Sequence, residues 1–198
     1  MNKSLIIALI LSQSVFWVLF PWLSTITNYL HPLALFVINM AIFFIAVIVT
    51  AIVQRVKYVI HAYWFHIIFL LYMGALLILL FIRPGDPGLR QANFVPFDTI
   101  QIYLSGNVDS LISMYNLWAN VGLFLPLGVY FAFFMYRWSV KWLLPFGVIG
   151  CIEVGQFVSN RGSLDIDDLI LNMVGVWLGY GVAPLLKRIF VVKERHNQ

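Results

Sequence analysis

Charged residues and cysteine are scarce in this chain. Only 10% of its 198 residues are Asp, Glu, Lys or Arg, and Cys151 is its single cysteine. One cysteine excludes an intramolecular disulfide and a cysteine-based zinc site. So few charged side chains cannot cover a soluble globule of this length, in which about a quarter of the residues are normally charged. The sequence therefore indicates a membrane protein.

Apolar residues make up 62% of the chain and occur in near-continuous runs. Such runs favour membrane-spanning helices over an outer-membrane barrel, whose strands alternate apolar and polar residues. Six runs have about the 20 residues that a helix needs to cross a bilayer. We expect an all-α integral membrane protein with residues 1–198 forming a single membrane domain. The predicted spans are Leu5–Leu23, Leu33–Val53, Tyr63–Ile82, Leu111–Tyr136, Trp142–Val158 and Leu169–Leu186.

The basic residues predict how the spans are oriented. If alternate connections are cytoplasmic, that side receives most of the Lys and Arg residues, so both termini should be cytoplasmic. The cytoplasmic set is Lys3, Arg55, Lys57, Arg137, Lys141, Lys187, Arg188, Lys193 and Arg195, and the opposite set is Arg83, Arg90 and Arg161. The formal net charge of +4 then reflects cytoplasmic residues facing anionic lipid, and gives no ground for nucleic-acid binding.

Polar side chains recur at helical spacing in the last three runs. The three sets are Ser113, Asn116 and Asn120; Glu153, Gln156 and Asn160; and Asp165, Asp168 and Asn172. Residues three, four or seven positions apart share one face of a helix, so three helices should turn polar stripes toward a common interior. An ionisable residue inside an apolar span, such as Glu153, indicates a functional site.

The long connection at residues 83–110 is expected on the extracytoplasmic side. Prolines and glycines at positions 84–88 break the third helix. Apolar residues then recur at helical spacing from Ile100 to Leu104, and Asp98 can cap this short helix. We expect the segment to act as a partly structured lid over the polar cluster, with a plain amphipathic connector as the alternative.

Glycine and proline predict how the last helices pack. Pro126 should kink the fourth span, and Gly122 and Gly128 on either side should allow close approach of neighbouring helices. Gly175 and Gly179 continue the face of the last span that carries Asp168 and Asn172. That face should therefore pack against a neighbouring helix.

Several short motifs follow one another in the second half of the chain. They are Asn93-Phe-Val-Pro-Phe-Asp98, Asn120 with Phe124-Leu-Pro-Leu-Gly128, Glu153 with Gln156, Arg161 with Asp165-Ile-Asp-Asp168, and Asn172 with Gly175 and Gly179. This ordered set, within about residues 93–186, resembles the VanZ-like family of bacterial membrane proteins. The resemblance implies a multi-pass protein of the bacterial cytoplasmic membrane, associated with resistance to glycopeptide antibiotics of the teicoplanin type.

The candidate ligand-binding residues are mainly amides and carboxylates. They are Asn93, Asn120, Glu153, Gln156, Arg161, Asp165, Asp168 and Asn172. Hard carboxylate oxygens suit Mg²⁺ or Ca²⁺, so Glu153, Asp165 and Asp168 form a candidate metal site. A structural interpretation stays open for the acidic run, because Asp165 and Asp167 can cap the last helix, and Asp167 can simply face water.

Three functions remain open. In the first, the protein binds an amphiphile at the extracytoplasmic face, either a lipid-linked cell-wall precursor or the lipophilic antibiotic. In the second, it is an intramembrane enzyme acting on a lipid headgroup such as a polyprenyl phosphate, with Glu153 and Asp168 as catalytic residues. No histidine is expected beside Ser113, Ser159 or Ser163 to activate a nucleophile, which favours binding. In the third, a lipid transporter, polar groups must reach the cytoplasmic half, where Gln13 and Asn39 are the main candidates.

Overall fold

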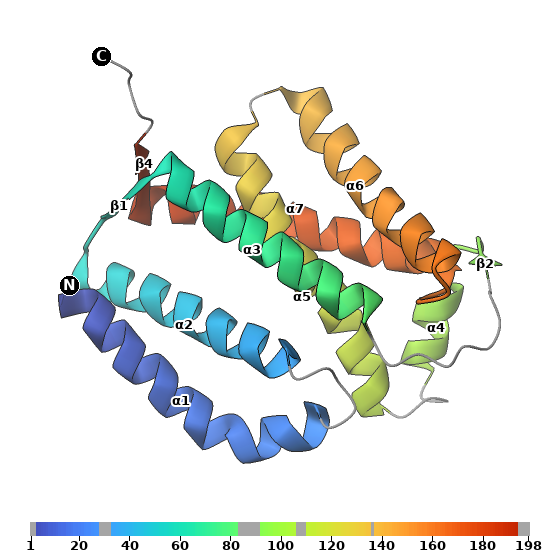
Figure 1. Cartoon of the computed structure of the whole chain (residues 1–198), viewed down its shortest axis with the longest axis horizontal. Coiled ribbons are helices and arrows are strands. Elements are labelled where there is room, and N and C mark those ends of the chain that lie inside the picture. Colours follow the sequence, from blue (N-terminus) through green and yellow to red (C-terminus); the bar gives the residue numbers. More distant parts are fainter. Residues whose placement is uncertain (1–2, 28–32, 83–91, 106–109, 136, 194–198) are drawn as a thin grey trace. The chain divides into compact units, whose positions relative to one another are not determined.

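The computed structural model of the chain describes residues 3–27, 33–82, 92–105, 110–135 and 137–193 (Figure 1). Side chains at 110–115 lie outside this description. The chain forms two compact units, one made of Met1–Pro84 with Leu185–Gln198 and the other of Gly85–Pro184. The candidate site residues all belong to the second unit.

Six helices in the described part are long and apolar enough to cross a membrane. They are α1 (Lys3–Thr27), α2 (Leu33–Gln54), α3 (Ala62–Phe81), α5 (Ser110–Phe134), α6 (Trp138–Val158) and α7 (Ile166–Ile189). They coincide with the six predicted spans, so the prediction of an all-α, multi-pass membrane protein is confirmed. Both α6 and α7 begin earlier than predicted, because their first turns carry the polar residues Lys141 and Asp167 and so fall outside the apolar runs.

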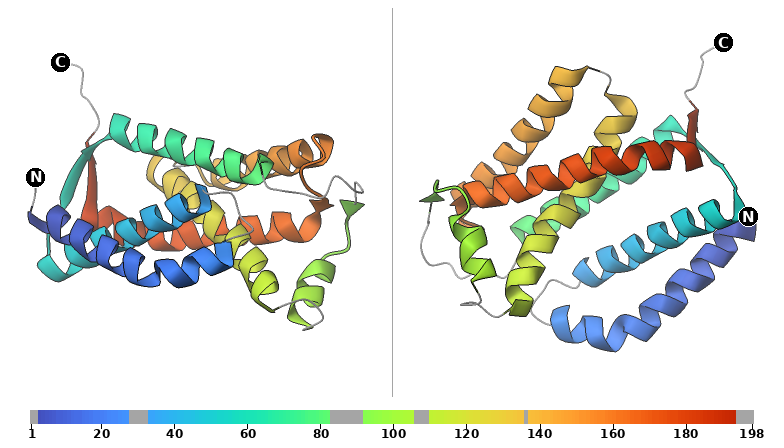
Figure 2. Two further views of the ribbon diagram at one scale, coloured as in Figure 1. Left: turned by 60° about the horizontal axis from the view of Figure 1, so that its bottom comes forward. Right: turned by 180° about the vertical axis from the view of Figure 1, so that it is seen from behind.

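In the first unit, α1 and α2 pack side by side (Figures 1 and 2). The Nε2 atom of Gln13 donates to Oδ1 of Asn39 at 3.1 Å, and Nδ2 of Asn39 donates back to Oε1 of Gln13 at 3.4 Å. The hydroxyl of Ser4 donates to the side chain of Gln54. These amides therefore bind each other as contacts between helices, which is a common use of polar residues in membranes. They offer little support for a transport path.

Two short parallel ladders, which the sequence does not predict, join segments that are distant along the chain. Strand β1 (Tyr58–His61) pairs with β4 (Phe190–Lys193), and β2 (Ala92–Asn93) pairs with β3 (Leu164–Asp165). Strands of this length are too short for a periodic pattern of apolar residues. Four spans separate β1 from β4 and two separate β2 from β3. Each ladder therefore joins segments that a six-span topology places on the same side of the membrane.

In the second unit, α5 and α7 cross with their backbones in close contact (Figure 2). A Cβ atom added to Gly175 would lie 2.2 Å from the carbonyl oxygen of Val121, and one added to Gly128 would lie 2.1 Å from that of Val176. A Cβ atom added to Gly179 would lie 2.3 Å from the carbonyl oxygen of Leu125. The glycines allow this approach because they have no side chain. The predicted close packing at these three positions is confirmed.

The prediction for Gly122 is wrong, because a Cβ there would meet no described atom within 4 Å. Gly122 precedes Gly128 by six residues, which places it on a different face of a helix with 3.6 residues per turn. Pro126 lies between the two, and α5 continues through it as one helix.

Helices α6 and α7 are antiparallel neighbours. Near the start of α6, the hydroxyl of Tyr180 donates to the carbonyl oxygen of Lys141 at 2.6 Å, and the rings of Trp142 and Trp177 lie 5.3 Å apart. Helices α5 and α7 are instead parallel, because Gly175 meets Val121 and Gly179, one turn later, meets Leu125. Consequently the end of α6 and the first half of α5 both lie beside the beginning of α7, at one end of this unit.

Candidate functional site

The site lies where α6 ends. Asn160 has a left-handed backbone with φ of 56°, and its N–H donates to the carbonyl oxygen of Phe157 at 3.3 Å. The N–H of Arg161 donates to the carbonyl oxygen of Gln156 at 2.8 Å. These two bonds form a Schellman motif, a common helix ending. Glu153 lies five residues before the last residue of α6, roughly 7 to 8 Å along the helix axis.

Glu153 and Asn172 are bonded to each other in the interior. Only 5% of Glu153 and 2% of Asn172 is exposed. The Nδ2 atom of Asn172 donates to Oε1 of Glu153 at 2.9 Å. The Oδ1 atom of Asn172 is buried and accepts no hydrogen bond from any described residue. Glu153 thus faces α7 and not the lipid.

A second polar pair joins α5 to α7. The Nδ2 atom of Asn120 donates to Oδ1 of Asp168 at 2.6 Å. Asp168 and Asn172 are one turn apart on α7, so that helix holds Asn120 from one neighbour and Glu153 from the other. The structure therefore brings together polar residues from the last three spans.

Asp165 forms hydrogen bonds both to α7 and to the segment that precedes α5. Its Oδ1 atom accepts the N–H of Asp167 at 2.9 Å, as a capping residue does at a helix start. Its Oδ2 atom accepts the hydroxyl proton of Thr99 at 2.5 Å. Thr99 lies in α4 (Asp98–Leu104). Asp165 is 7% exposed, so both bonds are shielded from water. Asp165 therefore caps α7 and also bonds α4.

Asp167 caps α4, a helix to which it does not belong. Its carboxylate accepts the N–H of Phe97 at 2.6 Å and that of Ile100 at 3.1 Å, and the residue is fully buried. The sequence-based expectation that Asp167 faces water is wrong. So is the prediction that Asp98 caps this helix, because Phe97 occupies the cap position and Asp98 is already the first helical residue.

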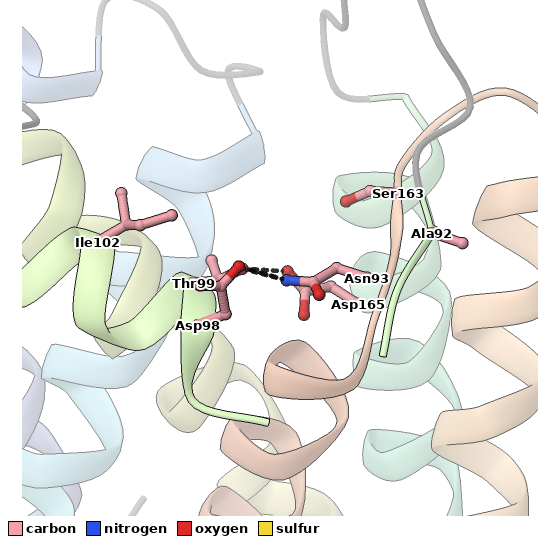
Figure 3. Close-up of a pocket in the computed structure, with 7 residues that line it drawn as sticks. All are labelled: Ala92, Asn93, Asp98, Thr99, Ile102, Ser163 and Asp165. Atoms are coloured by element: carbon pink, nitrogen blue, oxygen red, sulfur yellow. Dashed lines mark hydrogen bonds between the residues drawn. The ribbon is translucent and has the colours of Figure 1, made fainter. Parts of the chain in front are cut away.

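A hollow of about 420 Å³ opens between α4, β2 and the turn before β3 (Figure 3). Asn93 and Asp165 line one side of it and face Asp98 and Thr99 on α4. The Nδ2 atom of Asn93 lies 3.3 Å from Oγ1 of Thr99 and 3.4 Å from Oδ2 of Asp98. The full lining is Ala92, Asn93, Asp98, Thr99, Ile102, Ser163 and Asp165.

Among the described residues, the other predicted ones do not line this hollow. Gln156 packs against Gly162 in the turn after α6. Arg161 is exposed in the same turn. Asn116 donates to the hydroxyl of Tyr103 at 3.2 Å and so ties α5 to α4. The side chain of Ser113 lies outside the described residues, as do residues 83–91 and 106–109 of the predicted lid.

The predicted metal set does not form a metal centre in the described part of the chain. No group of three His, Cys, Asp or Glu side chains there is arranged to hold an ion. Glu153, Asp165 and Asp168 each accept a hydrogen bond from a different partner.

Sequence reasoning missed Thr99, Ser163 and the role of Asp167. Thr99 and Ser163 carry no recognisable signal, since each is a small hydroxyl residue next to a turn. For Asp167, the spacing Asp165-Ile-Asp167 just before an apolar run was the available sign. It places two carboxylates at a helix start, where only one can cap that helix.

The sequence profile of a family described as VanZ/LLP1 matches residues 68–187, which is more than half of the chain and includes α5, α6 and most of α7. Neither the curated proteins nor the solved structures contain a significant match. The extent of the profile match shows that this chain belongs to the VanZ/LLP1 family.

Proposed function

We propose that this protein binds the polar headgroup of an amphiphile in the hollow between α4, β2 and β3. By holding or shielding that amphiphile it contributes to resistance to teicoplanin-type glycopeptides. The ligand is a lipid-linked cell-wall precursor or the lipophilic antibiotic itself. The observation that carries the proposal is a hollow with polar walls at the end of helices long enough to span a membrane.

The position of the hollow suits a ligand with an apolar tail. α5, α6 and α7 provide apolar surface along a membrane, and the polar walls lie just past their ends. Exposed apolar side chains surround this region on α4 and the turn before it, including Phe94, Val95 and Leu104. An acyl or polyprenyl chain can stay in lipid while its headgroup enters the hollow.

The walls are held in place before any ligand binds. Asp165 and Asp167, both buried, fix α4 through bonds to Thr99, Phe97 and Ile100. A binding site that needs little ordering loses less affinity on association. This arrangement supports a recognition site more than a flexible connector.

Binding is favoured over catalysis by what the reactive groups already do. The hydroxyl of Thr99 is donated to Asp165, and Glu153 is engaged by Asn172 and does not line the hollow. A general base must reach the proton that it removes. Glu153 is therefore placed to support the site and not to attack a ligand in it.

The protein lies in the bacterial cytoplasmic membrane with both termini inside, so that the hollow faces the cell exterior. This orientation is supported by the excess of Lys and Arg in the connections on the side of both termini, because such an excess is typical of the cytoplasmic side. At the exterior face, the hollow meets both the lipid-linked precursor and the incoming drug.

The test is to fill the hollow without breaking its hydrogen bonds. Ser163 is exposed and lines the hollow, so Ser163→Trp should block a headgroup, whereas Ser159→Trp adds the same bulk outside it. Both variants are expressed in a susceptible Gram-positive host, and the inhibitory concentration of teicoplanin is measured at matched protein levels. We expect resistance to be lost only with Ser163→Trp. Equal resistance of both variants would show that the hollow is not used.

The bound molecule can be identified directly. Lipids that co-purify with the wild-type protein are extracted and analysed by mass spectrometry, with the Ser163→Trp protein as the reference. A species enriched only with the wild type names the ligand. A new product formed from added lipid-linked precursor would instead establish an enzyme.

A further inference from the structure

We propose that a basic patch in the first unit binds the headgroups of anionic phospholipids, in the leaflet on the side of both termini. The patch consists of Lys3, Arg55, Lys57, Arg188 and Lys193, whose side chains are all exposed. It belongs to the first unit, whereas the hollow belongs to the second. The inference therefore goes beyond the proposed function and does not depend on it.

The β1–β4 ladder brings basic residues together from segments that are far apart in the sequence (Figure 1). Tyr58, the first residue of β1, pairs with Phe190, the first residue of β4. Lys57 directly precedes β1 and Arg188 precedes β4 by two positions, so both lie at the same end of the ladder. Lys193 is the last residue of β4, about 10 Å along a strand that rises 3.3 Å per residue. Basic side chains therefore flank the ladder at both ends.

A hydrogen bond adds the two remaining members of the patch. The hydroxyl of Ser4 donates to the side chain of Gln54, which joins the start of α1 to the end of α2. Lys3 and Arg55 each lie next to one of these two residues. Arg55 has a left-handed backbone with φ of 53°, so α2 ends there and β1 begins three residues later. Three segments of the chain thus supply one patch.

The patch rests on a packed core. Tyr58 of β1 is 8% exposed, and Ile189, just before β4, is 5% exposed. These two side chains belong to one buried cluster with Ala8 of α1 and with Val47 and Ala51 of α2. The ladder is therefore held against both helices. The backbone that carries the basic side chains needs little ordering when a ligand binds, which favours affinity.

The described part of the first unit contains no Asp or Glu side chain. Residues 1–84 and 185–193 have none in their sequence, and Glu194 lies outside the described residues. The positive charge of the patch is therefore not offset by a carboxylate of this part of the chain. Basic residues near the surface of a membrane are attracted to its anionic lipids. Such a patch should select lipids with a net negative charge over zwitterionic ones.

Aromatic residues beside the patch place it at the level of the lipid headgroups. Tyr63 and Trp64 follow β1 at the start of α3 and are 51% and 50% exposed. The ring of Tyr63 stacks on that of His61, with centroids 5.8 Å apart. Tyr and Trp are enriched at the membrane–water interface, because one end of each side chain is apolar and the other is polar. The basic side chains therefore lie where lipid phosphates are found.

An excess of Lys and Arg on one side is general in membrane proteins and sets the direction in which spans insert. That role requires no particular arrangement in space. Here the ladder and the bond between Ser4 and Gln54 bring three segments together on a packed core. This arrangement favours a binding surface over a set of separate orientation signals.

The experiment compares two lipids and one soluble headgroup on the full chain. Dioleoylphosphatidylglycerol, dioleoylphosphatidylcholine and glycerol phosphate are titrated in neutral maltoside detergent. Relative affinity is obtained from thermal stabilisation as a function of concentration. The phosphatidylglycerol titration is repeated at about 0.5 M NaCl, where charges are screened more strongly.

Three double variants separate the patch from basic residues in general. Lys57→Gln with Arg188→Gln removes two charges from the patch. Lys141→Gln with Arg137→Gln removes the same two residue types around the start of α6, in the second unit and on the same predicted side of the membrane. Lys57→Arg with Arg188→Lys exchanges the two basic residues and keeps the charge.

We expect phosphatidylglycerol to bind more tightly than phosphatidylcholine, with a smaller difference at high salt. Removing the two patch charges should weaken phosphatidylglycerol binding about 25-fold, or about fivefold for each charge, while the other two variants stay close to wild type. Equal binding of the two lipids, or an equal loss in the variant at α6, would overturn the inference. Stabilisation by glycerol phosphate as strong as that by phosphatidylglycerol would also overturn it, because the ligand would then be a free phosphate and not a lipid.

Discussion

The carboxylate of Asp167 accepts the main-chain N–H of Phe97 at 2.6 Å, although 70 positions separate the two residues in the sequence. Phe97 has a left-handed backbone with φ of 69°, and the same carboxylate also accepts the N–H of Ile100. The first turn of α7 thus supplies the cap of α4. Together with the bonds of Asp165 to Thr99 and of Asn116 to Tyr103, this side chain holds one wall of the hollow in place.

Removing that cap should loosen α4 locally. We expect Asp167→Ala to cost about 1 to 2 kcal/mol, the usual value for a lost cap. The measurement is hydrogen–deuterium exchange of a peptide covering residues 94–104, in which uptake should rise. Asp98→Asn serves as the control, because Asp98 makes no cap bond. Unchanged uptake in Asp167→Ala would mean that α4 is held by other contacts.

The carboxylates of Glu153 and Asp168 should matter more for resistance than for folding. We expect Glu153→Gln and Asp168→Asn to abolish teicoplanin resistance while membrane insertion and expression stay near normal. Both substitutions keep an oxygen that can accept from Asn172 or Asn120 but remove the charge. Cys151→Ala on the exposed side of α6 is the control. Loss of protein in the two variants would point instead to a role in packing.

Contact between α5 and α7 should tolerate no side chain at its glycines. Gly175→Ala places a Cβ 2.2 Å from the carbonyl oxygen of Val121, so we expect a loss of about 1 to 3 kcal/mol or more. Gly181→Ala on the same helix is the matched control, since a Cβ there meets nothing within 4 Å. Thermal unfolding in detergent compares the two. Similar melting temperatures would contradict the close packing.

The proposed orientation predicts which positions an impermeant thiol reagent can reach. In a Cys151→Ser background, Ser163→Cys should be labelled on intact cells, whereas Lys57→Cys should be labelled only after the membrane is opened. Both positions are exposed, so accessibility depends on the side of the membrane. The opposite labelling pattern would reverse the assignment of the two faces.

The sequence predicts the spans well because each is a long apolar run with its own signal. It also predicts a polar face on each of the last three helices, because helical spacing determines which residues of a helix lie on one side. Asn120, Glu153, Asp168 and Asn172 belong to these three faces. Gly128 and Gly175 follow from the same logic. These features depend on local geometry that a helix imposes on its own residues.

What the sequence cannot predict comes from contacts between distant segments. The pairing of Asn93 with Asp165 in the β2–β3 ladder involves two residues on each side, too few for a pattern. The bonds from Asp167 to α4 depend on how the connection before α5 folds back. Asp98 looked like a cap because it precedes an apolar repeat, yet the helix begins one residue earlier than a capping Asp98 requires.

The glycine contacts between α5 and α7 also limit how this half of the protein can respond to a ligand. At these glycines no side chain separates the two backbones, so α5 and α7 cannot slide or tilt against each other without a clash between backbone atoms. The two helices should therefore move as one rigid unit, and the hydrogen bond between Asn120 and Asp168 should keep the same geometry near one end of it. Any rearrangement on ligand binding should therefore occur in α4 and β2. These two elements are joined to the start of α7 by the bonds of Asp165 and Asp167 and by the β2–β3 ladder.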